Sequence, residues 1–145
     1  MNTKFNFVRE GAGSRDDYYD VKEIEQVIGI LNTKSCRGAV SEILIDNVIC
    51  VWSPDQALQL FGVIKEYLGQ NSKLIICDLN LKSYCNAVSD NHLSGEEAPK
   101  ALYGRRHVYN IEEVCGLIAK SGLSITRKKI DRLSLIVEAG PKIEH

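Results

Sequence analysis

Two side chains in this sequence have the chemistry of a catalytic base. His107 follows the segment Tyr103–Arg106 in a stretch without clear periodicity, and an imidazole can take up and release a proton near neutral pH. Asp78 ends a short apolar run and can orient a substrate. Both also have ordinary structural interpretations, because many histidines form surface hydrogen bonds and polar residues at strand ends often begin turns. His107 and Asp78 are therefore the candidate catalytic residues.

A second group of residues suits ligand binding. Gly11 and Gly13 flank Ala12 after a short apolar run, so the backbone there can approach a ligand closely and offer amides to a carboxylate, or simply turn. Asp46 and Asn47 lie near the carboxyl end of a buried strand. Ligands of open α/β sheets bind beyond such strand ends, where the strand order reverses. These four residues are the expected cofactor-binding set.

The remaining polar candidates favour structural roles. Trp52 can stack on a purine or sugar, but an aromatic residue before a helix cap commonly packs as a hydrophobic staple. Arg105 and Arg106 can bind an anionic substrate, although charged turns are mostly solvated. Three further carboxylates can cap a helix or lie in solvent: Asp16, Asp17 and Asp20. No cluster of histidine, cysteine and carboxylate has metal-ligand spacing, so we expect no metal site.

The length and composition are typical of one ordinary globular domain, which we expect to span residues 1–145. The chain is 44% hydrophobic and carries a formal net charge of −1, which provides no global field for binding nucleic acid or an anionic membrane. The sequence lacks a signal-like apolar segment and the run of about 18 apolar residues that spans a bilayer, so we expect a cytoplasmic protein. Five cysteines without a Cys-x-x-Cys pair are typical of reduced thiols.

Hydrophobic periodicity and capping residues predict alternating strands and helices. Asp20 with Glu23 indicates a helix start, Ser53 with Gln56 a second, and Asn110 with Glu113 a third. The segment between residues 81 and 106 is expected to be largely a loop over one edge of the sheet. The expected strands lie at 4–8, within 39–52, at 73–79, at 123–128 and at 133–139, the last two as an antiparallel hairpin.

This pattern resembles the C-terminal half of the S-adenosylmethionine-dependent methyltransferase fold. The similarity covers Glu42 to Ala139, including a strand from Glu42, a helix after Trp52 and a strand from Lys73 to Asp78. Residues Leu102–Gly104 and the helix before Leu123 are similar to small predicted methyltransferases of glycan-synthesis clusters and phages. The resemblance implies S-adenosylmethionine as cofactor and methyl transfer to a small-molecule or sugar acceptor.

The chain also departs from that family. Too few residues separate Gly13 from the strand at Glu42 for two further strand-helix units. The family's second and third strands are therefore expected to be missing. The resemblance then implies about five strands, in the order 1-4-5-7-6 by the family's strand numbers, with helices on both faces. In the family an acidic residue at the end of the second strand holds the cofactor ribose, and the resemblance makes Asp16, Asp17 and Asp20 the candidates for that role. Many relatives also carry Leu-Glu-His where this chain has Ile49-Cys50-Val51.

Three hypotheses follow. The chain is a small methyltransferase, or it is a catalytically inactive binding or assembly module of the same fold, or it is a nucleotide-binding α/β module unrelated to methyltransferases. Loss of the outer strands would leave the first strand as a sheet edge, and pairing of two copies there would protect it. We therefore expect a homodimer.

Overall fold

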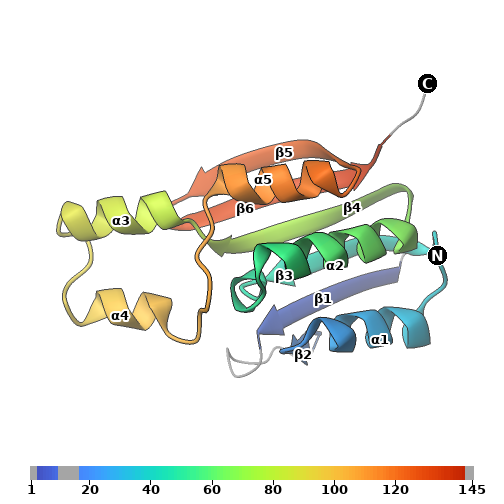
Figure 1. The fold of residues 1–145 in the computed structure, drawn as a ribbon, viewed down its shortest axis with the longest axis horizontal. Helices are drawn as coiled ribbons and strands as arrows, with labels where there is room; N and C mark the ends of the chain where they lie inside the picture. The colour runs from blue at the N-terminus through green and yellow to red at the C-terminus, as the bar shows by residue number, and fades with distance from the viewer. Residues whose placement is uncertain (1–2, 10–16, 143–145) are drawn as a thin grey trace.

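A computed structural model describes residues 3–9 and 17–142, and they form one sheet with helices (Figure 1). Within this part of the chain the sheet has six strands in the order β2-β1-β3-β4-β6-β5. Strands β2, β1, β3 and β4 pair in parallel, whereas β6 runs antiparallel to β4 and β5. The strands are β1 Thr3–Arg9, β2 Tyr19–Val21, β3 Val40–Asp46, β4 Leu68–Leu79, β5 Leu123–Asp131 and β6 Ser134–Pro141. The expected α/β class and the C-terminal antiparallel hairpin are confirmed.

The edge beside β1 differs from the expectation. β1 pairs with β3 as predicted, but a short strand, β2, pairs with Phe7–Arg9 on the other side. A second strand is thus present and the described sheet has six strands instead of about five. Three residues are too few to produce a recognisable alternation, and Asp20 belongs to this strand instead of capping a helix. The homodimer stays a prediction, although β2 covers Phe7–Arg9 of the β1 edge along which we expected two copies to pair.

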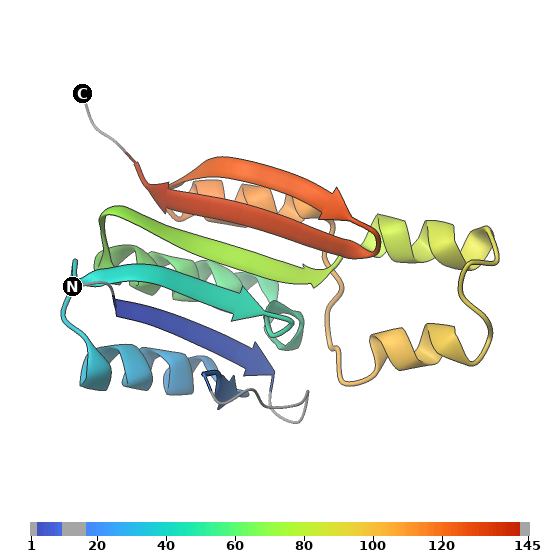
Figure 2. The same cartoon turned by 180° about the vertical axis from the view of Figure 1, so that it is seen from behind.

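Three of the helices form a single layer. The helices are α1 Ile24–Lys34, α2 Pro54–Tyr67, α3 Leu81–Ser89, α4 Glu97–Leu102 and α5 Ile111–Lys120, with a 3₁₀ turn, η1, at Ile49–Val51. α2 packs against both α1 and α5, and this layer lies in front of the sheet in Figure 1 and behind it in Figure 2. Right-handed crossovers that advance in one direction along a sheet place their helices on one face. The second helical layer that we expected is not seen in the described residues.

Side-chain burial alternates along the strands accordingly. Ile43 and Ile45 of β3 and Ile76 of β4 are fully buried towards the helices. The intervening side chains, such as Leu44 and Ile75, are only half-buried on the opposite face. This alternation is typical of a sheet that is covered on one side. We call the opposite side the open face of the sheet.

Local signals place the helix starts close to their expected positions. Ser53 and Gln56 form a reciprocal capping box at the start of α2, and Asn110 and Glu113 form another at α5. At α1 the box uses Glu23 with Gln26. The segment expected to be a loop instead carries α3 and α4, which project beyond the carboxyl ends of the central strands (Figure 1). These two helices and their flanking loops stand over the end of the sheet where ligands bind in α/β folds.

Candidate functional site

A cleft of about 440 Å³ opens at the carboxyl ends of β1 and β2. Its described lining residues are Arg9, Val21, Lys22, Val51, Tyr103, Gly104 and Arg106. The chain passes from β1 to β2 on one side and then crosses to β3 on the other side, so the strand order reverses at β1. The cleft therefore lies at the topological switch point, and its volume is in the range of small-molecule sites.

Three separate segments hold the cleft together. Arg9 is the last residue of β1, and Lys22 directly follows β2. The loop after α4 is fixed to η1, because the backbone N–H groups of Arg106 and His107 both donate to the carbonyl of Cys50, at 3.0 and 2.8 Å. Gly104 adopts a φ of +76° in this loop, a conformation that favours glycine. The far wall of the cleft is thus anchored to β3 through η1.

The cleft is positively charged on its described walls. Arg9, Lys22 and Arg106 all line it, and none of its described lining residues is a carboxylate. The guanidinium Nη1 of Arg9 lies 3.8 Å from the Cys50 sulfur. Tyr103 is 83% exposed, so its aromatic ring is accessible at the cleft wall. The combination of cations with apolar and aromatic surface suits an anion that carries an apolar group.

Asp78 lies in a buried polar network beside the cleft. Its carboxylate is 2% exposed and accepts hydrogen bonds from the backbone N–H of Leu79, at 2.7 Å, and of Cys50, at 3.2 Å. It also forms an ion pair with Arg105, whose side chain is only 10% exposed. Burial raises the pKa of Asp78, while the Arg105 guanidinium and the two N–H groups oppose that rise. These contacts occupy both carboxylate oxygens.

Arg105 connects this network to β3 and α4. Its Nη2 donates to Oδ1 of Asn47 at 3.0 Å, and its Nε donates to the carbonyl of Ala101 at 2.9 Å. Asn47 has a φ of +55° directly after β3, and its Nδ2 donates to Asp46 at 2.8 Å. Because Asn47 turns the chain here, β3 ends before the 3₁₀ turn instead of continuing towards Trp52. Arg105 thus ties the α3–α4 segment to the strand ends.

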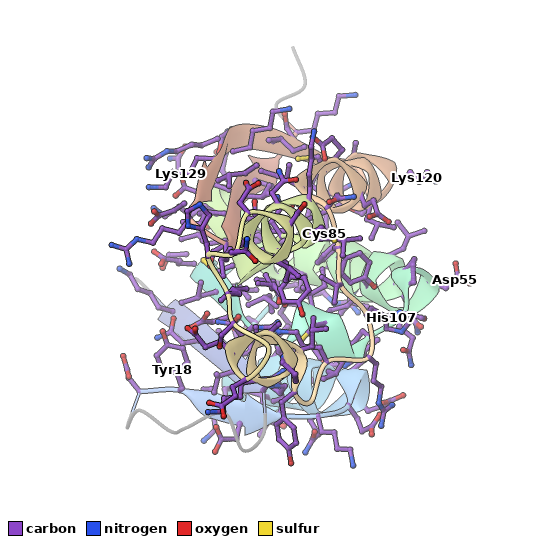
Figure 3. All side chains as sticks on the ribbon, turned by 90° about the vertical axis from the view of Figure 1, so that its left-hand side faces the viewer. Tyr18, Asp55, Cys85, His107, Lys120 and Lys129 are labelled. Carbon is purple, nitrogen blue, oxygen red and sulfur yellow. The ribbon has the colours of Figure 1, made fainter. Side chains whose placement is uncertain are left out.

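The structure brings together only part of the predicted site. Asp46, Asn47 and Asp78 meet around Arg105, but the lining of the cleft includes none of them. His107 is half-buried, with its ring 6.1 Å from that of Tyr109, and it too is absent from the cleft lining. Figure 3 looks onto this end of the molecule and labels His107. The predicted glycines, Gly11 and Gly13, lie outside the described residues, as does Asp16.

Sequence reasoning missed two of the three cations of the cleft. Arg9 and Lys22 were not singled out, whereas Arg106 was considered as an anion binder. The position of Arg9 directly after a predicted strand was a usable signal, because strand carboxyl ends carry ligands in this fold class. Lys22 gave no such signal, since the strand before it was not recognised. Trp52 is 2% exposed, which agrees with its packing interpretation.

The cysteines differ in their access to solvent, which predicts their reactivity. Burial raises the pKa of the Cys50 and Cys77 thiols to about 11 each, and it also raises the pKa of Cys115. Cys36 and Cys85 are exposed. We expect a thiol-reactive disulfide reagent at pH 7.5 to label two thiols per native chain rapidly and all five after unfolding. Rapid labelling of Cys50 in the native protein, detected by peptide mass spectrometry, would contradict the buried position of η1.

Residues 3–9 and 17–142 contain no group of three histidine, cysteine or carboxylate side chains placed to hold a metal ion. In the same ranges, each helix is too short or too polar to cross a bilayer.

Comparison with solved structures identifies the fold. A protein from Pyrococcus horikoshii matches 98% of this chain and 83% of its own, with a TM-score of 0.65 and 14% identity. An O-methyltransferase family 2 protein from Planctomyces limnophilus, solved with apigenin, matches 70% of this chain at a TM-score of 0.53 and 18% identity. An S-adenosylmethionine-dependent methyltransferase from Thermotoga maritima matches 75% of this chain at a TM-score of 0.54 and 12% identity.

These likenesses show the methyltransferase fold. The chain spans 30% of the length of the Planctomyces enzyme and 59% of the Thermotoga one. No family model matches the sequence, and no curated protein matches it. The similarity to the methyltransferases of glycan-synthesis clusters and phages stays a prediction.

The described cleft residues do not fit S-adenosylmethionine. The resemblance implies an acidic residue at the end of the second strand, where it would hold the ribose, but β2 ends at Val21 and Lys22 follows. An ammonium group has no acceptor for the ribose hydroxyls, and three cations repel a sulfonium. Asp20 is exposed and does not line the cleft. We therefore derive no reaction step through this cofactor.

Proposed function

We propose that the chain is a small-molecule-binding domain with the methyltransferase fold, and that its ligand occupies the cleft at the ends of β1 and β2. The main support for this proposal is the position of that cleft at the topological switch point of the sheet. Arg9, Lys22 and Arg106 supply charge, Val51 supplies apolar surface, and Tyr103 supplies an exposed aromatic ring. The domain thus corresponds to the binding-module hypothesis.

The candidate catalytic residues support binding over catalysis. Asp78 has both oxygens engaged inside the fold, with Arg105 as its ion-pair partner. His107 lies beside Tyr109 and is not part of the cleft lining. A catalytic base must reach the proton that it removes. We assign Asp78 a positioning role, in which it fixes the loop after α4 through Arg105.

Methyl transfer from S-adenosylmethionine is the second candidate. The observation in its favour is the fold, since solved structures of methyltransferases match the chain at TM-scores above 0.5. In-line methyl transfer depends mainly on proximity and orientation, so it does not require a conspicuous catalytic cluster. Its acceptor would be a small molecule or a sugar. Binding of S-adenosylhomocysteine in the cleft would favour this candidate.

Blocking the cleft tests the proposal. Val51→Trp places a bulky ring in the cleft wall, whereas Val88→Trp adds the same ring to an exposed position of α3. Ligands are titrated calorimetrically against both variants and the native chain. The panel contains S-adenosylhomocysteine, adenosine diphosphate, adenosine and a sugar phosphate. We expect at least one compound to bind the native chain and the Val88 variant with equal affinity and the Val51 variant at least tenfold more weakly.

Two outcomes would contradict the proposal. One is the absence of saturable binding by every compound at concentrations that detect millimolar affinity, about −4 kcal/mol. The other is binding that the Val51 substitution leaves unchanged, which would place the ligand elsewhere. The thermal midpoints of both variants are measured first, so that lost binding is read only from folded protein.

A further inference from the structure

We infer that the ligand of this cleft is a phosphorylated small molecule, whose phosphate contacts Arg9, Lys22 and Arg106. This inference rests on the proposed function and assigns the chemical class of the ligand. The three cations come from the end of β1, from the residue after β2 and from the loop after α4. Segments far apart in the sequence thus place three positive side chains around one cleft.

These cations are not neutralised by the described part of the protein. Five ion pairs occur in residues 3–9 and 17–142, and none of them includes Arg9, Lys22 or Arg106. The neighbouring Arg105, by contrast, forms an ion pair with Asp78. Three like charges that line one cleft repel each other unless an anion lies between them.

The charge of the cleft is local. The chain as a whole carries a formal net charge of −1, so a positive overall surface does not explain the cluster. A phosphate monoester carries about −1.5 to −2 charges at neutral pH, and it offers several acceptor oxygens. Guanidinium groups bind such oxygens through two parallel hydrogen bonds. A phosphate therefore matches a cleft lined by three cations better than a single carboxylate does.

The other walls indicate an organic group attached to the phosphate. Val51 is half-buried and lines the cleft beside the cations. Tyr103 presents an exposed ring that can stack on a planar group. The volume of about 440 Å³ exceeds the space that phosphate alone requires. Adenosine diphosphate combines phosphate with a planar base, so it is a suitable probe.

Charge substitutions test the inference with adenosine diphosphate, adenosine and inorganic pyrophosphate. Lys22→Gln and Arg106→Gln each remove one cation of the cleft, and Lys128→Gln removes one from β5, at the opposite edge of the sheet. We expect each cleft substitution to weaken binding of adenosine diphosphate by roughly 3- to 10-fold, since both side chains are exposed to solvent. Lys128→Gln should leave the affinity unchanged. Adenosine should bind at least tenfold more weakly than its diphosphate.

The outcomes separate this inference from the proposed function. If adenosine or S-adenosylhomocysteine binds in the cleft but adenosine diphosphate and pyrophosphate do not bind, the inferred ligand class is wrong. The proposal that the chain is a small-molecule-binding domain is then still supported. If Lys128→Gln weakens binding as much as Lys22→Gln, the attraction is nonspecific and the inference is overturned. If adenosine diphosphate and pyrophosphate both bind but Val51→Trp affects neither, the anion site lies elsewhere and both proposals fail.

Discussion

Replacing Arg105 with methionine should lower the free energy of unfolding by about 3–5 kcal/mol, because it leaves the Asp78 carboxylate buried without its counter-charge. Asp78 is 2% exposed, so water cannot replace the lost guanidinium. The substitution also removes the donors to Asn47 and to the Ala101 carbonyl. Urea unfolding followed by circular dichroism measures the change.

The destabilisation should shrink as the pH falls. Burial raises the pKa of Asp78, and the guanidinium opposes that rise, so the variant has a higher folded-state pKa than the native chain. An aspartate with a raised folded-state pKa stabilises the fold below its unfolded-state pKa, and that stability is lost as the pH rises through the folded-state value. The deficit of the variant should therefore be larger at pH 8 than at pH 5.

Two controls accompany this substitution. Arg106→Met changes the neighbouring, exposed arginine and should alter the unfolding free energy by less than about 0.5 kcal/mol. Asp78→Asn combined with Arg105→Met removes both charges and should recover part of the loss. A deficit for Arg105→Met that is under 1 kcal/mol and independent of pH would show that the ion pair does not support the fold.

Replacing Trp52 with alanine should cost about 3–5 kcal/mol, because it empties the volume of a large buried side chain. The indole Nε1 donates to the carbonyl of Lys22 at 3.0 Å, and the Trp52 carbonyl accepts from the hydroxyl of Tyr109. The side chain thus joins the start of α2 to the end of β2. Thermal and urea unfolding of the native chain and the variant under the same conditions would measure the difference in unfolding free energy.

Trp52→Phe separates packing from the hydrogen bond. It keeps an aromatic ring and removes the N–H donor, so we expect a smaller loss of about 1–2 kcal/mol. The Lys22 carbonyl would lose its hydrogen bond to the indole. Because Lys22 lines the cleft, we expect the affinity for a ligand to fall even when the protein stays folded. An alanine variant within 1 kcal/mol of the native chain would contradict the buried position of Trp52.

Local sequence signals predicted much of the fold. The capping boxes at Ser53 and Asn110 depend on residues three positions apart, so they are readable without tertiary context. The parallel pairing of β1 with β3 required more than local signals: two apolar runs predicted the strands, and the resemblance to the methyltransferase fold implied their order. The hairpin of β5 and β6 followed from two alternating runs around a charged turn.

The cleft and the buried network were less accessible to sequence reasoning. β2 has three residues, and its partner strand decides its conformation. Asp78 and Arg105 are 27 positions apart, and nothing in the local pattern indicates that they pair. Arg105 and Arg106 look equivalent in the sequence, yet the fold buries one and exposes the other. Only tertiary structure distinguishes the positioning arginine from the one that lines the cleft.

The open face of the sheet also shapes how this sequence can change over evolutionary time. Along the central residues of β3, β4 and β6, alternate side chains are buried towards the helices, as Ile45, Ile76 and Val137 are. Their neighbours on the open face, such as Leu44 and Ile136, retain contact with solvent. Replacements should therefore accumulate with a period of two along these strands, polar residues being accepted only on the open face. Sequence divergence in this protein would therefore be greatest at the strand positions that face away from the helices.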